Sequence, residues 1–358
     1  MSFVVKVLKA AHGDCIFIQG IFDNGEHKNI LIDGGPSKAY KYRKYEGELF
    51  KELEDIRKKD QIIDLLILTH VDDDHIGGLL SAFKNGELLD KLTKKVWFNS
   101  GKLIFDTFDK VADESNYIDM GLRNSDGQGL TSIGQGVTFE SYLEKNNIWD
   151  KKLIIEGEDR ELFGAKFIFL SPTKEKLEKL LIKWKKDKPE SLTSSKVTDY
   201  DKTFDELLVS DKFKNDKSVH NGSSIAFIFE YKEKRILLLG DAHDDVIVDS
   251  LKKKIEGGQS NRFELVKLSH HGSKNNTSAS FLNLIECNDY VISTDASKHG
   301  LPNKLTLARI FDSKPKASIH FNYPEIIKLK IFKSEQERTD IKNSGFNISN
   351  SGTIFNYD

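Results

Sequence analysis

The sequence predicts an α/β fold in which sheets and helices form layers. Short apolar runs bounded by turn residues, typical of strands, occur in both the first and the last third of the chain. Between them lie segments whose apolar residues recur at helical spacing. A chain that mixes strands and helices in this order predicts α/β layers. Its 358 residues allow one large domain or two ordinary ones.

The first hundred residues predict several strands, one helix and then a buried strand. The strand-like runs are FVVKVLKA, CIFIQGIF and HKNILIDGG, which turn residues separate. Residues 45–61 follow, with Leu49, Phe50 and Leu53 at helical spacing. The apolar run IIDLLILT at 62–69 then predicts a strand that leads into a turn rich in His and Asp.

The middle of the chain predicts a strand followed by an amphipathic helix. KFIFLSP closes the strand, and residues 171–189 predict a helix with Ser171 as N-cap and Pro172 in its first turn. The apolar residues on one face of this helix are Leu177, Leu180, Leu181 and Trp184. This pattern indicates a helix that packs on the body and exposes its Lys/Glu face.

The domain organisation is predicted from a change in composition. From Glu190 to Ser218 the chain is rich in Ser, Thr, Asp and Lys with little periodicity, which predicts a long exposed excursion. A second block of strands follows: SSIAFIFEY, KRILLLGDA, FELVKLSHHGS and DYVISTD. We predict one domain over 1–358, with a first half at 1–100, an insertion at 101–215 and a second half at 216–358.

Composition excludes several classes of protein. Charged residues make up 31% and hydrophobic residues 38%, the balance of a soluble globular protein. No apolar run approaches the roughly 20 residues that span a bilayer, and the first residues lack the pattern of an export signal, so a cytoplasmic protein is expected. The two cysteines, Cys15 and Cys287, offer no disulfide framework. With a net charge of −2, any nucleic-acid contact requires a local basic patch.

The turn LTHVDDDHIGG, residues 68–78, is the first candidate site. His70 and Asp72 are two apart, so in extended backbone their side chains point the same way, and Asp74 and His75 follow in the turn. Burying these acidic groups together without a cation would be strongly repulsive. A solvated acidic loop with an N-capping Asp is the alternative, but it does not explain two histidines beside the acids. We therefore predict bound metal.

Two later strand ends carry further metal-ligating residue types. KRILLLGDAHDD delivers Asp241, and FELVKLSHHGS delivers His270 and His271. A carboxylate at a strand end can bridge two cations because each oxygen binds one. Asp241 alone could equally cap the helix that follows, so the prediction depends on three such strand ends occurring together.

Together these motifs resemble those of a known family. GDCIFI, ILIDGG, THVDDDHIGG, LLLGDA and LSHHGS are similar in order and spacing to the metallo-β-lactamase superfamily of hydrolases. The HxDxDH form, with NGSSIAF, HHGS and KHGLP, resembles the soluble nuclease-like domain of the DNA-uptake protein ComEC and its cytoplasmic relatives. The resemblance implies an αββα sandwich with a dinuclear metal site at the rim of its two sheets.

The resemblance implies roles for the motif residues. The implied ligands are His70 and Asp72 for the first cation, Asp74, His75 and His270 for the second, and Asp241 as the bridge. We predict His270, the residue nearer the strand end, as the ligand and place His271 on the substrate side, although either histidine satisfies the motif. Water or Asn221 would complete the first site, with His220 as a substitute ligand. The Asp72 carboxylate is a harder ligand, in the hard–soft sense, than the histidine usual at this position. The two divalent ions are therefore expected to be zinc or manganese, with magnesium as a further candidate.

Other residues are predicted to support the centre or face the substrate. Asp33 is expected to be a buried carboxylate that orients a ligand. The predicted catalytic residues are Asp74, His271 and His299, with His299 as a proton donor or phosphate contact. The remaining residues predicted to support the ligands or contact substrate are His12, Asp14, Asn221, Ser224, Lys274, Lys298 and Lys304.

The predicted function is metal-dependent hydrolysis of a phosphodiester in nucleic acid or a nucleotide. Two cations can hold a hydroxide near neutral pH and stabilise the oxygens of an in-line displacement. The fold does not choose the reaction, so a carboxylic ester or thioester hydrolase is the alternative enzyme. A third hypothesis is a metal-stabilised sensor or interaction component of a larger system, such as phage defence. A protein partner could bind through 101–215, and no membrane contact is expected.

Overall fold

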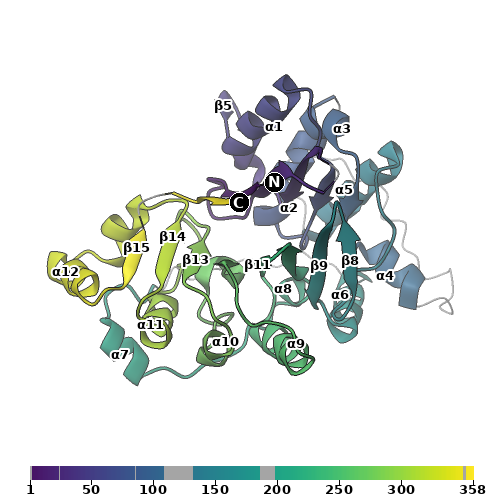
Figure 1. The fold of residues 1–358 in the computed structure, drawn as a ribbon. Coiled ribbons are helices and arrows are strands. Elements are labelled where there is room, and N and C mark those ends of the chain that lie inside the picture. Colours follow the sequence, from purple (N-terminus) through teal and green to yellow (C-terminus); the bar gives the residue numbers. More distant parts are fainter. Residues whose placement is uncertain (1, 24, 85, 109–131, 186–197, 350–351) are drawn as a thin grey trace.

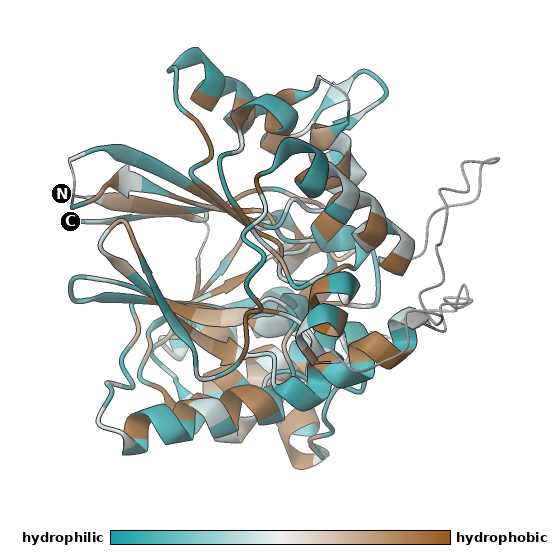
Figure 2. Ribbon diagram, turned by 90° about the vertical axis from the view of Figure 1, so that its right-hand side faces the viewer, coloured by the Kyte–Doolittle hydropathy of each residue, from teal (hydrophilic) through white to brown (hydrophobic). Residues whose placement is uncertain are grey.

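Two β-sheets face each other, and helices cover the outer face of each (Figure 1, Figure 2). The computed structural model describes residues 2–23, 25–84, 86–108, 132–185, 198–349 and 352–358. The α/β class predicted from the sequence is confirmed, with the αββα sandwich that the motifs implied. No helix within these ranges combines the length and apolar character needed to cross a membrane.

The first sheet has six strands, five of them from the first hundred residues. Its strand order is β16 (Ile354–Tyr357), β1 (Phe3–Val7), β2 (Ile16–Ile21), β3 (His27–Ile32), β6 (Leu65–Ile67) and β7 (Val96–Trp97). The pairs from β16 to β3 are antiparallel, whereas β3, β6 and β7 are parallel. Parallel pairing brings the carboxyl ends of β3 and β6 to the same edge of the sheet.

The second sheet has eight strands. Its order is β15 (Asn347–Ser349), β14 (Ser318–Phe321), β13 (Asp289–Ile292), β12 (Leu265–Lys267), β11 (Lys234–Leu238), β10 (Ala226–Tyr231), β9 (Ala165–Ser171) and β8 (Asp159–Leu162). Strands β11 to β15 pair parallel, and β8 to β11 pair antiparallel. The carboxyl ends of β11 and β12 therefore also lie side by side.

Apolar side chains fill the space between the sheets. In β1 the buried residues alternate with half-buried ones, which sends Val5 into the core. Ile18 from the first sheet shares one buried cluster with Phe167, Phe227 and Phe229 from the second. Fully burying a side chain of this size contributes about 1.5–3 kcal/mol, so this layer holds the two sheets together.

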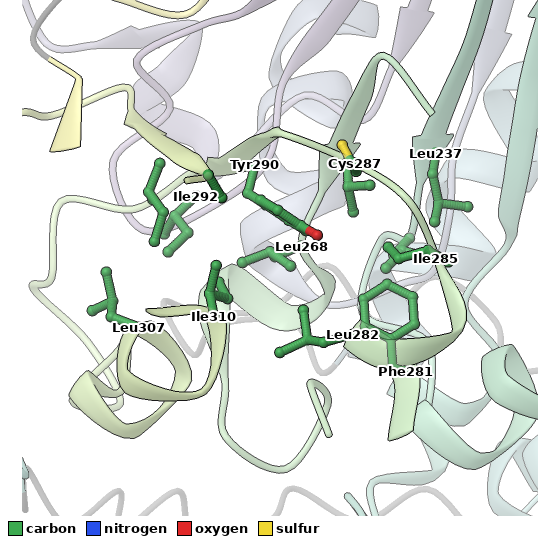
Figure 3. Close-up of a cluster of buried hydrophobic side chains, with 14 of the residues drawn as sticks. Leu237, Leu268, Phe281, Leu282, Ile285, Cys287, Tyr290, Ile292, Leu307 and Ile310 are labelled. Atoms are coloured by element: carbon green, nitrogen blue, oxygen red, sulfur yellow. The ribbon is translucent and has the colours of Figure 1, made fainter. Parts of the chain in front are cut away.

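Helices bury the outer faces of the sheets. Those of the first half are α1 (Glu48–Lys58), α2 (Asp73–Phe83), α3 (Leu88–Leu92) and α5 (Ser132–Asn146). Those on the second sheet include α9 (Asp244–Glu256), α10 (Ala279–Leu284) and α11 (Lys304–Ser313). Figure 3 shows part of this second interface, where Tyr290 and Ile292 of β13 face Leu282 and Ile310 of the helices.

Smaller elements complete the described chain. They are α4 (Gly101–Phe108), α6 (Lys174–Lys185), α7 (Phe204–Val209), α8 (Val219–Gly222), α12 (Glu335–Asn343) and the hairpin of β4 (Lys41–Tyr42) and β5 (Tyr45–Glu46). In α6, Leu177 and Leu180 are buried as predicted. Ser171, however, ends β9 rather than capping this helix, and the Thr173 hydroxyl accepts from Lys176 N at 3.3 Å.

The stretch predicted as an insertion is in part built into the two layers. Helix α5 packs on α2, and β9 pairs with β10 over most of its length. The described part of 101–215 therefore contributes to both layers, and α7 lies within the predicted excursion. Residues 109–131 and 186–197 of this region lie outside the described residues.

Candidate metal centre

Strand ends from both sheets bring histidines and aspartates together. His70 follows β6, and α2 begins at Asp73, so Asp74 and His75 lie in its first turn. Asp241 follows β11, and a short turn with His271 follows the parallel neighbour β12. Sites at the carboxyl ends of parallel strands are common in α/β folds because loops from several strands converge there.

Asp241 lies between the imidazoles. Its Oδ1 is 3.4 Å from His75 Nε2 and 3.9 Å from His271 Nε2, and its Oδ2 is 3.7 Å from His70 Nε2. Asp74 Oδ2 is 3.4 Å from His271 Nε2. Among the described residues these side chains form four overlapping groups of three. The first group is His70, His75 and Asp241, and the second group is Asp74, His75 and His271. The other two include Asp14, once with Asp33 and His75 and once with Asp241 and His271.

The inward atoms of these groups lack hydrogen-bond partners. In the described part of the chain, the buried Nε2 atoms of His70, His75 and His271 and the Oδ1 of Asp241 make no hydrogen bond, and only the longer contacts between them given above remain. An unpaired buried polar atom costs about 1–3 kcal/mol. Ligand atoms bound tetrahedrally at about 2.1 Å stand about 3.4 Å apart, close to the separations here. The residues therefore fit divalent metal ions, which would satisfy all of these atoms.

Buried acceptors behind the histidines fix their orientation. His75 Nδ1 is 2.7 Å from Asp33 Oδ2, and Asp33 also accepts from the backbone N and hydroxyl of Thr69. His271 Nδ1 donates to Ser293 O at 2.9 Å, with Asp14 Oδ1 at 3.3 Å. Each bond directs Nε2 towards Asp241, the arrangement that metal-binding histidines usually have.

The charges of the centre shift its pKa values strongly. Burial lowers the pKa of His271, but Asp241 and Asp14 outweigh it and raise the value to about 9. The pKa of His75 is likewise raised, by Asp241 and Asp33 against the effect of burial. Burial raises the pKa of Asp241, yet the neighbouring histidines hold it well below the usual range. Without a cation, imidazolium charge balances the carboxylates, so a metal must displace protons.

The structure places His271, rather than the predicted His270, in the second ligand group. His270 Nε2 is 3.9 Å from Asp241 Oδ2, but its Nδ1 faces Asp216 at 3.3 Å and Asn276 at 3.2 Å, and a quarter of its side chain is exposed. His271, 2% exposed, enters the second group instead. Both residues have left-handed φ values, 47° and 52°, so the backbone turns and returns the second histidine to the centre.

Asp72 and His220 lie together beside the first group. Asp72 Oδ2 is 3.7 Å from His70 Nε2, while its Oδ1 is 2.7 Å from His220 Nδ1. Burial raises the pKa of Asp72, but His220 and His70 lower it overall. His220 Nε2 is buried and has no partner among the described residues. Both residues are therefore close to the first group without belonging to it.

The two residues of the NGSS segment support their neighbours. Asn221 Nδ2 donates to Asp216 Oδ2 at 2.7 Å, and Ser224 Oγ accepts from Asp241 N at 3.1 Å. Gly240 precedes Asp241 with φ at +48°, and a Cβ there would collide with the Ser224 hydroxyl. The hydrogen bond from Asp241 N to the Ser224 hydroxyl fixes the backbone of Asp241, so Ser224 helps to position that candidate ligand.

Lys304, predicted to contact substrate, is instead part of the fold. It is 1% exposed, its Nζ is 2.6 Å from Glu337 Oε1, and it lies over the Phe332 ring. Lys298 and His299 are exposed in the loop after β13, where φ of His299 is 57°. Lys274 is half-buried, and its backbone rather than its ammonium makes the described bonds.

His12 and His299 lie near the centre. Burial lowers the pKa of His12 to about 4, and Asp74, Lys298 and His271 are the charges nearest to it. Burial lowers the pKa of His299 as well, with Asp74 and His270 among its neighbours. His12 Nδ1 is buried without a partner in the described residues. The pKa values of both imidazoles are therefore lowered by their surroundings at the border of the centre.

Some residues of the centre gave little or no signal in the sequence. Lys267 is buried and forms an ion pair with Asp14, which in turn stands behind His271. A lysine inside the apolar run FELVKLS was a signal that could have indicated a buried ion pair. Asp216 and Asn276, which contact His270, lie in polar loops whose composition predicts no particular contact.

Comparisons with known proteins agree with this architecture. Residues 9–139 match the model of the metallo-beta-lactamase superfamily. The match includes the HxDxDH turn and Asp33 but ends before Asp241. No curated protein matches the chain.

The similar solved structures are distant in sequence. The metallo-beta-lactamase fold protein YhfI from Bacillus subtilis is 11% identical, with 99% of each chain covered and a TM-score of 0.40. Zn(2+)-bound PqqB from Methylobacterium extorquens is 11% identical, with 99% of each chain covered and a TM-score of 0.43. The diiron beta-hydroxylase CmlA from Streptomyces venezuelae is 11% identical over 99% of this chain and 54% of its own, with a TM-score of 0.43.

The αββα fold, the family match and the clustered ligands support one general description. They indicate the metallo-beta-lactamase fold, with candidate ligands for divalent metal clustered at the strand ends of the described residues. Fold alone does not select among reactions at phosphorus, at a carbonyl or at other centres.

Proposed function

We propose that this chain is a phosphodiesterase or nuclease that uses two divalent cations. The observation that carries the proposal is the pair of overlapping ligand groups, with Asp241 Oδ2 towards His70 and Oδ1 towards His75 and His271. Two cations side by side suit an in-line displacement at phosphorus, where both the attacking and the leaving oxygen carry charge. The resemblance of Asp72, HHGS and KHGLP to the ComEC nuclease-like domain supports the same substrate class.

Within the chain, the donors of the two groups and the nearby Asp72 would be divided between two cations, because the inward Nε2 of the shared His75 can bind only one of them. His70, Asp241 and the nearby Asp72 would bind one, and Asp74, His75 and His271 the other, with Asp241 between them. Bound cations supply Lewis-acid polarisation and lower the pKa of water. Asp33 and Ser293 keep the imidazoles of His75 and His271 directed inward. The protein's own contribution is thus a preorganised cradle of oxygen and nitrogen donors.

The border of the centre suits a phosphate. Lys298 is exposed beside His299, and the neutral His12 lies near Asp74. A flexible ammonium group and imidazole N–H groups bind phosphate oxygens without adding negative charge to an acidic centre. We propose that these three residues contact the non-bridging oxygens of the diester.

The experiment that tests this function compares substrate classes and metals. Purified protein is analysed for metal, stripped, and reloaded separately with zinc, manganese or magnesium. Turnover is then measured with bis-p-nitrophenyl phosphate, p-nitrophenyl acetate and an acyl thioester. We expect two metal ions per chain and hydrolysis of the diester alone. Acyl turnover without diester turnover would establish the ester or thioester alternative, and no turnover with any metal would leave the sensor hypothesis.

A matched pair of variants strengthens this test. Asp241→Asn removes charge from the middle of the centre, whereas Asp289→Asn removes charge from a carboxylate that pairs with His320 on β14. The first variant should lose metal and turnover, and the second should keep both. Equal loss in the two variants would show that the measured activity does not come from this centre.

A further inference from the structure

The β4–β5 hairpin combines aromatic rings with positive charge. Residues 38–46, KAYKYRKYE, contain four cations, three tyrosines and one acidic residue, Glu46, which lies opposite Lys41. The hairpin projects beside α1 (Figure 1). In a chain with a net charge of −2, this is a local basic patch of the kind that contact with nucleic acid requires.

The pairing of the hairpin places two tyrosines on one face. Tyr42 is directly opposite Tyr45, so their side chains point to the same side of the ribbon. Their exposed fractions are 55% and 59%. Arg43 at the tip lies over the Tyr42 ring, with its Cζ 5.4 Å from the centroid. A guanidinium over an exposed ring forms a platform on which a nucleobase can stack.

The opposite face of the hairpin is fixed to the body. Lys41 lies 4.2 Å from the centroid of Phe50 and 3.1 Å from Glu87 Oε2, which holds the ribbon against α1 and the start of α3. Tyr40 is 1% exposed and donates its hydroxyl to Glu87 Oε2 at 2.6 Å. Their contacts with Glu87 and Phe50 give Tyr40 and Lys41 a structural role in holding the hairpin to the body. Nothing in the described fold requires the exposed pair to be aromatic.

The hairpin lies close to the border of the metal centre. Pro36 and Ser37, just before it, pack against Gly77 of α2, the helix that carries Asp74. Lys38 Nζ is 3.7 Å from Asp295 Oδ2, in the loop that continues to Lys298 and His299.

Tyr323 gives a second connection between hairpin and centre. Its hydroxyl accepts from Ala11 N at 2.8 Å, next to His12, and Lys9 lies over its ring. Burial raises the pKa of Tyr323 to about 12, and Asp295 and Tyr45 add to the effect. Cations and rings therefore continue from the border of the centre to the hairpin.

We infer that the hairpin strip, defined as Lys38, Tyr42, Arg43, Lys44 and Tyr45, binds single-stranded nucleic acid and guides it to the metal centre. The inference rests on the proposed function and names its substrate class. Unstacked bases offer their faces to Tyr42 and Tyr45, and the three cations face the phosphates. A duplex hides its base faces, so the strip should favour a single strand.

The test measures binding separately from hydrolysis. Fluorescein-labelled phosphorothioate dT20, which resists cleavage, is titrated with metal-loaded protein by fluorescence anisotropy. Tyr42→Ala with Tyr45→Ala should weaken binding by about tenfold or more, because each stacked base contributes roughly that factor. Tyr42→Phe with Tyr45→Phe keeps the rings and should bind like the parent protein. Circular dichroism and the unfolding midpoint verify that each variant is folded.

Charge is tested by the salt dependence of the same binding. Arg43→Gln with Lys44→Gln should reduce the slope of log Kd against log salt by about 1.4, since each phosphate contact on a single strand contributes about 0.7. The matched control is Lys252→Gln with Lys316→Gln, two exposed lysines of the second half, which should leave the slope unchanged.

Three results would overturn the inference. They are unchanged dT20 affinity in the double alanine variant, equal affinity for a 20-base-pair duplex, and equal affinity for an oligoglutamate of the same charge, which would indicate an acidic protein partner. Hydrolysis of bis-p-nitrophenyl phosphate by the parent protein tests the proposed function independently. If the diester is hydrolysed but the hairpin variants bind normally, only the strip is refuted. If the strip binds the oligonucleotide but no diester is cleaved, only the phosphodiesterase proposal is refuted.

Discussion

The two ligand groups of the centre are held by their surroundings to different degrees. In the second group, buried acceptors orient both imidazoles: Asp33 behind His75, and Ser293 with Asp14 behind His271. In the first group, His70 Nδ1 has the Thr69 hydroxyl at 3.1 Å, a hydroxyl that also donates to Asp33.

Asp72, which lies beside the first group, is also less enclosed than the residues of the second group. Its side chain is 28% exposed and its Oδ1 is engaged with His220. The comparison teaches that buried carboxylate and carbonyl acceptors orient the two imidazoles of the second group, whereas His70, the imidazole found only in the first group, has a hydroxyl behind it. Ligands held by buried partners keep their geometry without metal, and ligands held by one weak contact do not.

The largest effect expected concerns the two adjacent histidines. His271→Ala should lose the metal of the second group together with hydrolysis, because His271 Nε2 is one of the buried unpaired atoms of that group. His270→Ala should keep the metal, since its Nδ1 contacts Asp216 and its side chain is partly exposed. Elemental analysis of both variants decides the question. Metal loss in His270→Ala with retention in His271→Ala would restore the order predicted from the sequence.

Removing the support of the second group should have the next largest effect. Asp33→Asn keeps the shape but not the charge that orients His75, and loss of such a partner typically weakens metal binding by about 10- to 100-fold. Titration of metal-free protein with a competing chelator gives the affinity. Asp64→Asn is the matched control, because Asp64 is also buried but pairs with Lys28 and with Asn29 N away from the centre. Equal losses in both variants would mean that Asp33 acts only on the fold.

Metal removal should make stability depend on pH through the second group. The pKa of His271 is raised to about 9 in the folded, metal-free protein, against an ordinary histidine value of about 6.5. Its contribution is therefore present below about pH 6.5 and is lost as the pH rises towards 9, on the order of 3 kcal/mol. Unfolding of metal-free protein at pH 6.5 and 9 measures this difference. The difference should shrink in His271→Gln, and an equal difference there would assign it to other groups.

The same asymmetry explains which parts of the centre the sequence could predict. His70, Asp74 and His75 fall in one contiguous turn after an apolar strand, so a local pattern was enough to bring them together. Which of His270 and His271 faces the centre depends on two consecutive residues with left-handed φ values, and no local sequence pattern predicted that conformation. Non-glycine residues adopt that conformation rarely, and surrounding packing must stabilise it.

Long-range contacts account for the other differences between sequence and structure. Lys304 faces Glu337, which is 33 positions further along the chain, and sequence spacing does not reveal such a pair. Strand β9 belongs to the sheet because it pairs with β10, although 54 residues separate the end of one from the start of the other. Periodicity predicted the α/β layers well because each element carries its own apolar face, and the resemblance of the motifs implied the αββα sandwich. The periodicity did not predict which elements from the middle of the chain would join the two layers.

The smallest effect expected concerns metal preference in the first group. Asp72→His replaces a hard carboxylate with imidazole beside His70, which should raise activity with zinc relative to manganese several-fold. Because His220 Nδ1 contacts Asp72 Oδ1, the test includes His220→Ala, which frees that carboxylate while keeping its charge. The zinc-to-manganese activity ratio should change in Asp72→His and stay near the parent value in His220→Ala. A ratio unchanged in both would exclude Asp72 as a ligand and leave His220 as its only partner. A shift in His220→Ala alone would instead indicate that the buried His220 Nε2 contacts the metal, and that the first group is completed by the histidine.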